Sequence, residues 1–342
     1  MKPFHRFSGF RVLFLCLSIS MAVPGLAEAI QLKIATISPE GSFWMTRMQA
    51  GAEEVARRTE GRVAFRFYPG GVMGDDRSVL RKIRVGQLHG GAVVLGSLAD
   101  VFPDSQIYAV PLKLRGFDEV DFVRERLDPF IIEGLEKGGF VTFGLAEGGF
   151  ARIMSTRRVE TVEDLRNAKV WVPDNDRNAL EGVKAFDVAP TPLSIADVRA
   201  GLQTGLIDTV TTPPIGAVAL QWHTQIRYLT DMPFLYVAGI LAVDRRTFSR
   251  IAPADRAAVR EVMGETFREI DRRNRADNAA AMEALRGQGI EFVLPSDAAL
   301  ADWRSRADTV PGRLVAAGRL STEVVEMLEA ALAEFRAGAD GS

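Results

Sequence analysis

From Ile30 onward, segments with the hydrophobic period of a strand alternate with segments that have the period of a helix. This alternation leaves few fold classes open to the chain. Residues 30–37 carry apolar side chains at every second position, as a strand does. A helical pattern then begins at about Ser42 and ends at Gly61, after which residues 63–67 return to the strand period. Strands separated by helices in this way predict a parallel sheet covered by helices.

The same order of elements returns later in the chain. A turn at residues 68–71 leads into a helix that either Asp75 or Asp76 caps. The segment 161–212 then predicts a second α/β unit, with a helix at 162–165, a strand at 169–172, a helix to about 186 and a further helix that Ser194 and Asp197 cap as a box. We therefore expect two α/β units.

One helical pattern is much longer than the others. It begins at Pro253, a favourable first helical residue, and ends at Arg286, where Gly287 closes it. At 1.5 Å per residue such a helix is about 50 Å long, which exceeds the need of one small domain. We expect it to brace both units.

The first residues have the pattern of a secretory signal peptide. Basic residues lead it, namely Lys2, Arg6 and Arg11. An apolar run at 12–23 follows, and it is too short to span a bilayer as a helix. Cleavage fits after Ala27 or Ala29, and the strand that begins at Ile30 favours Ala29. The only cysteine, Cys16, lies in the apolar run, so we expect a soluble periplasmic protein without thiol, disulfide or lipid anchor.

The local signatures of most enzymes are missing from the sequence. The mature chain keeps only His89 and His223, and it has no HExxH, GxSxG, GxxxxGK[ST] or GxGxxG pattern. Adjacent acids such as Asp75 and Asp76 usually cap helices rather than transfer protons. The formal net charge of −2 includes no basic run suited to nucleic acid. We expect no catalysis, no metal, no cofactor and no nucleic-acid partner.

With these residues laid out, the chain resembles the substrate-binding proteins of tripartite ATP-independent periplasmic (TRAP) transporters, of the dicarboxylate-binding type. The blocks that carry the resemblance, in this order, are Tyr68–Arg77, Thr161–Leu165, Lys169–Pro173, Pro190–Leu193 and Leu202–Asp208. The resemblance implies a two-domain α/β fold of the Venus-flytrap kind, with crossing strands and a long bridging helix. It also implies a small-molecule ligand and a membrane permease made of a large and a small integral subunit.

The domain division that follows from this resemblance has four parts. They are a signal peptide at 1–29, a first domain at 30–152 plus 241–282, a second domain at 153–240 plus 283–335, and a flexible tail at 336–342.

The second domain departs from the family pattern at the ligand site. In members that bind acids, the Lys-x-Arg-x-Pro strand carries an arginine whose planar guanidinium binds a carboxylate through two hydrogen bonds. In this chain the arginine position is occupied by Trp171. A second family arginine corresponds to Ala151, and the neighbouring Arg152 points to the opposite face of a strand. An asparagine of the family is replaced by Thr212, and a frequent aromatic residue by Ile195.

The first domain departs in the same direction. Positions that are polar in binders of acidic sugars correspond to Ile37 and Val94, and only Asp76 keeps a charge, unless it serves as a helix cap. Trp171 offers a stacking face, with ordinary core as the less favoured alternative, and Trp222 is equally compatible with a wall of the cleft and with core. Because a buried carboxylate without a cationic partner is costly, we expect a neutral or substantially apolar ligand.

The sequence leaves more than one function open. The favoured one is capture by domain closure and delivery to the permease. The alternative is a periplasmic sensor, or a chaperone for lipid or hydrophobic cargo, with the same fold. An exported hydrolase has no motif in its favour, and a monomer is expected.

Overall fold

The structure is a computed structural model that describes residues 29–174 and 176–340. The signal segment through Glu28, with Cys16, therefore lies outside the described residues. None of the helices within the described ranges is both long and apolar enough to cross a membrane.

The chain opens as strand, helix, strand, helix, strand. These elements are β1 (Ile30–Thr36), α1 (Phe43–Arg58), β2 (Val63–Tyr68), α2 (Asp76–Arg84) and β3 (Gly90–Val94). β1 pairs in parallel with both β2 and β3, which confirms the predicted parallel arrangement. Of the two candidate caps, Asp75 caps α2, because its side chain accepts a hydrogen bond from the Ser78 amide at 2.9 Å.

Two short 3₁₀ helices and a long helix follow before the chain enters the first crossing strand. They are η1 (Leu95–Leu98), η2 (Pro103–Ala109) and α3 (Phe117–Lys137), and the strand is β4 (Phe140–Ser155). Apolar side chains on one face of α3 are fully buried, among them Val120, Val123 and Leu127. Their spacing of three and four residues is the reason that this segment forms an amphipathic helix.

The second α/β unit contains short elements. They are α4 (Val162–Arg166), β5 (Trp171–Pro173), α5 (Arg177–Val183), η3 (Lys184–Phe186), β6 (Thr191–Leu193), η4 (Ile195–Asp197), α6 (Val198–Thr204), β7 (Thr209–Thr212), α7 (Pro214–Ala219) and η5 (Trp222–Gln225). The strand predicted from residue 169 begins two residues later, at Trp171. The predicted capping box of Ser194 and Asp197 is wrong, because the Ser194 hydroxyl lies 2.7 Å from the Asp197 carboxylate and the chain forms a 3₁₀ turn there.

The last part of the chain returns through a second crossing strand and then turns helical. Its elements are β8 (Tyr228–Asp244), α8 (Arg245–Ser249), α9 (Pro253–Gly287), β9 (Glu291–Val293), α10 (Asp297–Ala307), α11 (Val310–Ala316) and α12 (Thr322–Asp340). α12 includes residues 336–340, which the predicted division assigns to a flexible tail. Arg336 is held by the Glu119 carboxylate of α3 at 2.8 Å.

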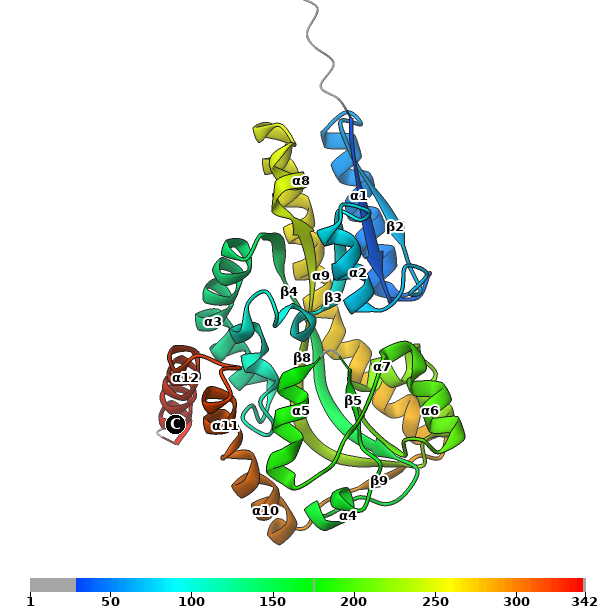
Figure 1. The fold of residues 1–342 in the computed structure, drawn as a ribbon, viewed down its shortest axis with the longest axis vertical. Coiled ribbons are helices and arrows are strands. Elements are labelled where there is room, and N and C mark those ends of the chain that lie inside the picture. Colours follow the sequence, from blue (N-terminus) through cyan, green and yellow to red (C-terminus); the bar gives the residue numbers. More distant parts are fainter. Residues whose placement is uncertain (1–28, 175, 341–342) are drawn as a thin grey trace, which may run out of the picture.

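A mixed sheet runs through the molecule in the order β2-β1-β3-β8-β4-β7, with β9 beside β8. β4 and β8 are its longest strands, and they pair antiparallel from the upper to the lower part of the molecule (Figure 1). Their register shifts between Glu147 and Gly149, where Gly149 has a φ of 98°. These continuous strands carry the chain between the two halves.

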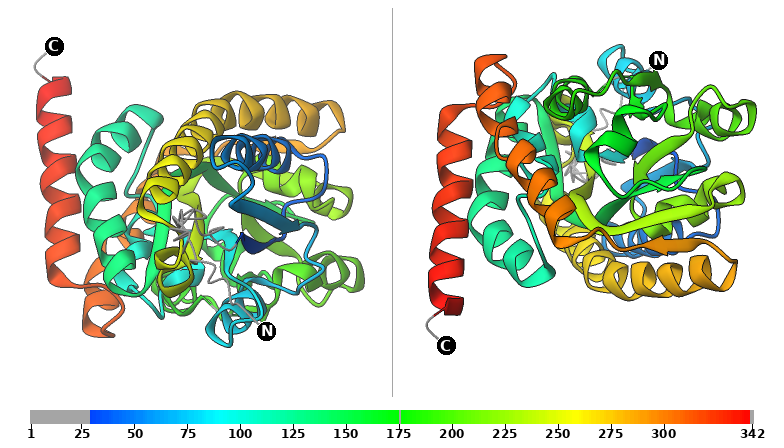
Figure 2. Two further views of the ribbon diagram at one scale, coloured as in Figure 1. Left: turned by 90° about the horizontal axis from the view of Figure 1, so that it is seen from above. Right: turned by 90° about the horizontal axis from the view of Figure 1, so that it is seen from below.

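The helix α9 braces both halves, as its length predicts. It packs against α1 in the upper half, against β4 at the crossing, and against α7 in the lower half (Figures 1 and 2). Its buried side includes Val259, Met263, Phe267, Ile270 and Leu285. Helices α3 and α12 lie side by side on another flank (Figure 2). The predicted division assigns these two helices to different domains, and it stays a prediction.

Candidate functional site

A cavity of about 700 Å³ lies between the two halves of the molecule. The upper half contributes the segment 36–44 and the end of β3, while the lower half contributes β5, α5 and the start of α7. The crossing strand β8 supplies residues 234–239. A ligand in this cavity would therefore touch both halves at once.

Most of the expected site residues lie on the wall of this cavity. They are Ile37 and Val94 from the upper half, and Trp171, Ile195, Thr212 and Trp222 from the lower half. The other expected residues, Asp76, Ala151 and Arg152, are not among the lining residues that the structure describes.

Trp171 and Trp222 form one aromatic unit at the lower wall. The ring centroids are 5.2 Å apart with an angle of 78° between the planes, which is an edge-to-face arrangement. The indole N–H of Trp171 donates to the Leu193 carbonyl at 3.0 Å, so its single donor is already used. Both residues also pack in the apolar core around Val198, and the cavity wall and the core are continuous here.

Asp76 lies directly behind the upper wall. Its carboxylate accepts hydrogen bonds from the Val94 amide at 3.0 Å and from the Ser97 hydroxyl at 2.8 Å. Burial raises the pKa of Asp76 to about 6, although these two hydrogen bonds oppose the shift. Asp76 therefore positions two lining residues and is not the cap of α2.

Neither the second family arginine position, Ala151, nor its neighbour Arg152 is among the described lining residues. Ala151 is fully buried and pairs with Leu235 across the β4–β8 ladder. Arg152 binds Asp231 through its Nε atom at 3.1 Å. Its guanidinium is thus committed to a carboxylate of the protein itself.

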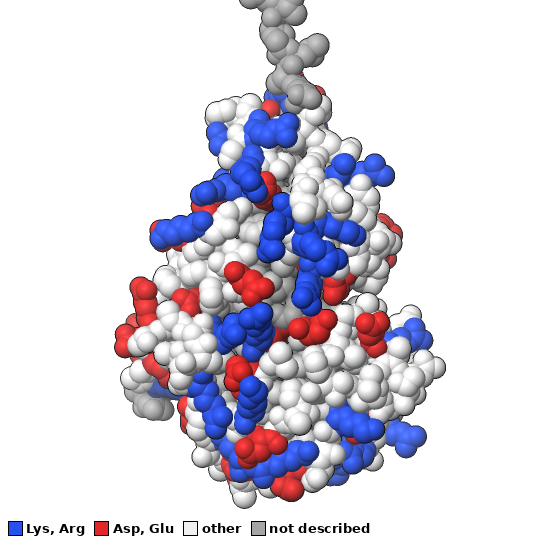
Figure 3. Space-filling view, viewed as in Figure 1, with Lys and Arg blue, Asp and Glu red and all other residues white. Residues whose placement is uncertain are grey.

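Among the described residues that line the cavity, none is a lysine, an arginine or a histidine. The charged lining residues are acidic, and each one already has a partner. Glu40 accepts from Gln49 at 3.0 Å, and Asp277 pairs with Arg273 at 2.9 Å. Asp176 caps α5 by accepting from the Ala179 amide at 2.8 Å, and burial raises the pKa of its carboxyl. On the face shown in Figure 3, basic side chains lie on the outer surface, interspersed with acidic ones.

The sequence did not point to several lining residues. Ser105, Gln106 and Tyr108 come from η2, and Phe234 and Tyr236 come from β8. No motif marked the 103–109 segment, because a short 3₁₀ helix has no extended hydrophobic period. Phe234 and Tyr236 lie in a nearly continuous apolar run at 232–243, and the alternating burial that sets them apart is visible only in the structure.

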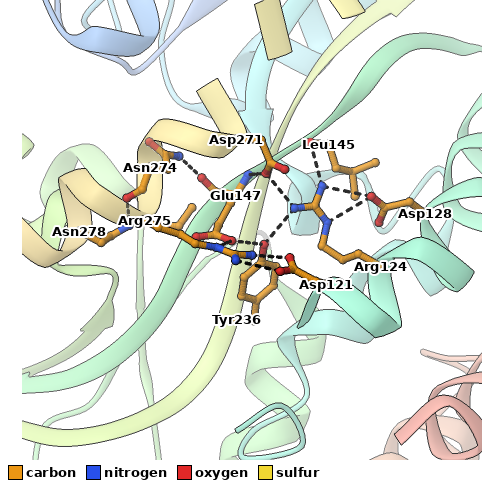
Figure 4. Close-up of polar contacts among 11 residues, drawn as sticks. Asp121, Arg124, Asp128, Leu145, Glu147, Tyr236, Asp271, Asn274, Arg275 and Asn278 are labelled. Atoms are coloured by element: carbon orange, nitrogen blue, oxygen red, sulfur yellow. Dashed lines mark hydrogen bonds and ion pairs between the residues drawn. The ribbon is translucent and has the colours of Figure 1, made fainter. Parts of the chain in front are cut away.

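A buried polar network borders the cavity where β4, β8, α3 and α9 meet (Figure 4). Arg124 of α3 donates to the Leu145 carbonyl at 3.0 Å and pairs with Asp128 at 3.1 Å and with Asp271 at 2.8 Å. Burial disfavours its charge, but Tyr236 and the two carboxylates raise the pKa of Arg124 above its ordinary value. The guanidinium therefore stays charged and ties α3 to α9.

The same network reaches the cavity wall through α9. The Asn274 side chain donates to the Glu147 carbonyl and accepts from the indole N–H of Trp44 at 2.9 Å, and both Trp44 and Asn274 line the cavity. One turn later, Asn278 donates to the Gly148 carbonyl at 2.8 Å. α9 is thus bound to β4 where the register of β4 shifts, beside the site.

No group of three potential metal ligands of the His, Cys, Asp or Glu type occurs within residues 29–174 and 176–340.

A cavity between two α/β halves, joined by crossing strands and a long helix, defines the class of two-domain solute-binding proteins. Residues 34–316 match the family model described as "Bacterial extracellular solute-binding protein, family 7". The chain belongs to this family, whose members are solute-binding components of transporters and not enzymes.

Curated relatives and solved structures agree with this assignment. The sialic acid-binding periplasmic protein SiaP of Vibrio cholerae is 20% identical over 280 residues, covering 80% of this chain and 86% of the relative. The C4-dicarboxylate-binding periplasmic protein DctP of Rhodobacter capsulatus is 24% identical over 331 residues, covering 93% of this chain and 96% of the relative.

Two crystal structures of TRAP periplasmic solute-binding proteins show the same fold. The protein from Roseobacter denitrificans with bound β-D-glucuronate has a TM-score of 0.82 and 18% identity, covering 88% of this chain and 99% of its own. The protein from Ralstonia eutropha H16 with bound (S)-2-acetolactate has a TM-score of 0.81 and 21% identity, covering 89% and 99%. The predicted two-domain α/β fold and the predicted family are therefore confirmed.

Proposed function

We propose that this protein captures a neutral or largely apolar small molecule in its central cavity and delivers it to a TRAP permease of large and small membrane subunits. Membership of the solute-binding family supports the transport role. The observation that carries the ligand class is the cavity wall, whose described residues include acidic groups and no basic ones.

The electrostatics of the wall disfavour an anion. Removing a carboxylate from water without a cationic partner costs several kcal/mol, and a nearby carboxylate such as Asp176 adds repulsion. The family position for the carboxylate-binding arginine is occupied by Trp171, whose N–H is already bonded. Arg152, the nearest candidate for a replacement, is paired with Asp231. An acidic sugar or a dicarboxylate would thus enter this cavity without a counter-ion.

The size and composition of the wall suit an apolar body. Small-molecule sites have volumes of about 300 to 1,000 Å³, and this cavity falls in that range. Its aromatic lining residues are Phe43, Trp44, Tyr108, Trp171, Trp222, Phe234 and Tyr236. Aromatic faces and edges stabilise a neutral ring or chain by burial of apolar area.

The mechanism is capture without chemistry. A ligand that contacts both halves has more contacts in the closed form than in the open form, and it therefore shifts the population toward closure. The continuous strands β4 and β8 and the helix α9 connect the halves and are the elements that must bend. Closure would then present one surface made from both halves to the permease, in the periplasm.

A charge-swap variant tests this ligand class. Thermal shift is measured with β-D-galacturonate and with its uncharged methyl ester, for the natural protein and for Trp171→Arg. We expect no stabilisation of the natural protein by galacturonate and a new stabilisation of the variant, because the arginine supplies a counter-ion. Val72→Arg is the matched control, since Val72 is 71% exposed and does not line the cavity. Tight binding of galacturonate by the natural protein would overturn the proposal.

A further inference from the structure

The outer face of α2 carries three arginines that have no acidic partner. Arg77, Arg81 and Arg84 are all exposed, and their spacing of four and three residues places them on one face of the helix. None of them forms an ion pair with a described residue, and Arg81 makes only a long hydrogen bond of 3.5 Å to the Ser78 hydroxyl. Figure 3 shows basic side chains gathered over this helix. α2 therefore presents a positive surface.

The acidic residues nearby do not balance this charge. Residues 66–85 contain five basic and two acidic residues, in a chain whose formal net charge is −2. Of the two acids, Asp75 caps α2 and Asp76 is buried behind the cavity wall, and neither pairs with an arginine of the helix. A counter-charge for the three arginines must therefore come from solvent ions or from another molecule.

Two exposed valines flank the same helix. Val72 is 71% exposed and Val85 is 64% exposed, and they are two of the four large apolar side chains that are exposed among the described residues. Val72 lies in the turn before α2, and Val85 follows its last residue. Protein interfaces combine arginine with apolar side chains in this way, whereas a merely solvated charged face needs no exposed valines. We call Val72, Arg77, Arg81, Arg84 and Val85 the α2 patch.

The α2 patch is held in place and is connected to the cavity wall. The Lys82 ammonium group donates to the Met73 carbonyl at 2.7 Å, which fixes the preceding turn to α2. The Gly71 amide of this turn donates to the carbonyl of Thr36 at 3.0 Å, and Thr36 lines the cavity. A surface that is already ordered loses little conformational entropy on binding. A partner on the α2 patch would thus contact the same unit that forms the upper wall of the cavity.

We propose, resting on the delivery role above but not on the class of ligand, that the α2 patch docks this protein onto an acidic, partly apolar face of the permease. A guanidinium binds a carboxylate through two parallel hydrogen bonds, which fixes the orientation of the contact. The exposed cations of α2 are all arginines, and its one lysine, Lys82, is already bonded to Met73. This composition favours a protein surface over a lipid surface, because arginine is enriched and lysine depleted at protein interfaces. The patch steers the encounter and acts mainly on the association rate.

Removal of the three charges tests this docking. The protein purified from the periplasm is added to the large and small permease subunits in nanodiscs of neutral lipid, and surface plasmon resonance measures the association rate at several salt concentrations. We expect the triple variant Arg77→Gln, Arg81→Gln and Arg84→Gln to associate about tenfold more slowly than the natural protein at low salt, with a weaker salt dependence. Its melting temperature should not change, because the three side chains are exposed and unpaired among the described residues.

The matched control removes the same charge elsewhere. It is Arg272→Gln, Arg304→Gln and Arg313→Gln, three exposed arginines of α9, α10 and α11 that also form no ion pair with a described residue. It should associate as fast as the natural protein. Equal rates for the two triple variants overturn the α2 patch, whereas no association of the natural protein contradicts delivery to the permease as well. Binding to protein-free phosphatidylglycerol vesicles with the same arginine dependence, in place of the permease, assigns the patch to a membrane surface and also overturns the proposal.

Crosslinking gives an independent readout. Cys16 is the only cysteine of the sequence and lies in the predicted signal peptide, so Val85→Cys introduces a single thiol into the mature protein. A photoactivatable maleimide attached to this thiol should crosslink the protein to a permease subunit. Leu294→Cys is the control, because Leu294 is 75% exposed and follows β9 in the lower half of the molecule (Figure 1). No crosslink from position 85, or equal crosslinking from both positions, overturns the docking surface.

Discussion

The indole rings of Trp171 and Trp222 pack edge to face with 5.2 Å between the ring centroids, and this contact joins β5 to η5 at the cavity wall. Trp222 is only 2% exposed. We expect Trp222→Ala to lower the free energy of unfolding by about 3 to 5 kcal/mol, because it leaves a large void and removes the ring contact. Trp222→Phe should cost less. Urea denaturation measures both, and a loss below about 1 kcal/mol for the alanine variant would show that the wall is not part of the core.

The buried carboxylate of Asp76 predicts a pH-dependent stability. Burial raises the pKa of Asp76 from 3.8 to about 6 in the folded protein, so the ionised form is disfavoured on folding. Its contribution therefore opposes folding at neutral pH, by up to about 3 kcal/mol, and this penalty is relieved as the pH falls through 6 toward 4. The isosteric Asp76→Asn keeps an acceptor for Val94 and Ser97 without the charge. We expect it to be more stable than the natural protein at pH 7 in urea titrations, with a difference that shrinks below about pH 5. A difference that does not change with pH would contradict this assignment.

The Arg124 network predicts a large loss on removal of one partner. Arg124→Met leaves Asp128 and Asp271 without their shared cation in a buried setting, which costs about 3 to 5 kcal/mol of unfolding free energy. Arg57→Met is the control, because Arg57 is exposed and its pair with Glu54 is on the surface. Chemical denaturation of the two variants should show a large change for the first and no measurable change for the second. Similar small changes in both would mean that the network does not tie α3 to α9.

The glycine at the register shift of β4 predicts a further loss. Gly149 has a φ of 98°, and a Cβ there would approach the Asn278 amide nitrogen to 2.6 Å. We expect Gly149→Ala to destabilise the protein by about 1 to 3 kcal/mol through backbone strain and the displaced Asn278 contact to β4. Gly312→Ala in α11, where the same change meets no atom within 4 Å, should be neutral or slightly stabilising. Equal melting temperatures for the two variants would contradict the close approach at the crossing.

Most of the fold was predictable because it depends on local patterns. The alternation in β1 and β2, the helical pattern from about Ser42 and the cap candidate Asp75 gave elements close to the observed ones. The structure has a capping box at Thr161 and Asp164 that the sequence analysis did not name, whereas the box predicted at Ser194 and Asp197 does not form, because these two side chains bond each other. A three-residue strand such as β5 has no period of its own, so its start was missed by two residues.

The site was less accessible to sequence reasoning, because its geometry depends on contacts between distant segments. The positions of Trp171 and Thr212 came from the family pattern, and the structure places both on the cavity wall. That Asp76 lies behind this wall follows from its bonds to Val94 and Ser97, 18 and 21 residues away. The Gln106 side chain donates to Asp176, 70 residues along the chain, and no local motif encodes that contact.

Identification of the natural ligand tests the neutral cavity most directly. The protein is purified gently after expression in a bacterium that exports it, then denatured, and the released small molecule is identified by mass spectrometry. We expect an uncharged compound with a substantial apolar body, and readdition of that compound should raise the melting temperature of the refolded protein. Release of a dicarboxylate, a uronate or a sialic acid that rebinds tightly would contradict the neutral cavity.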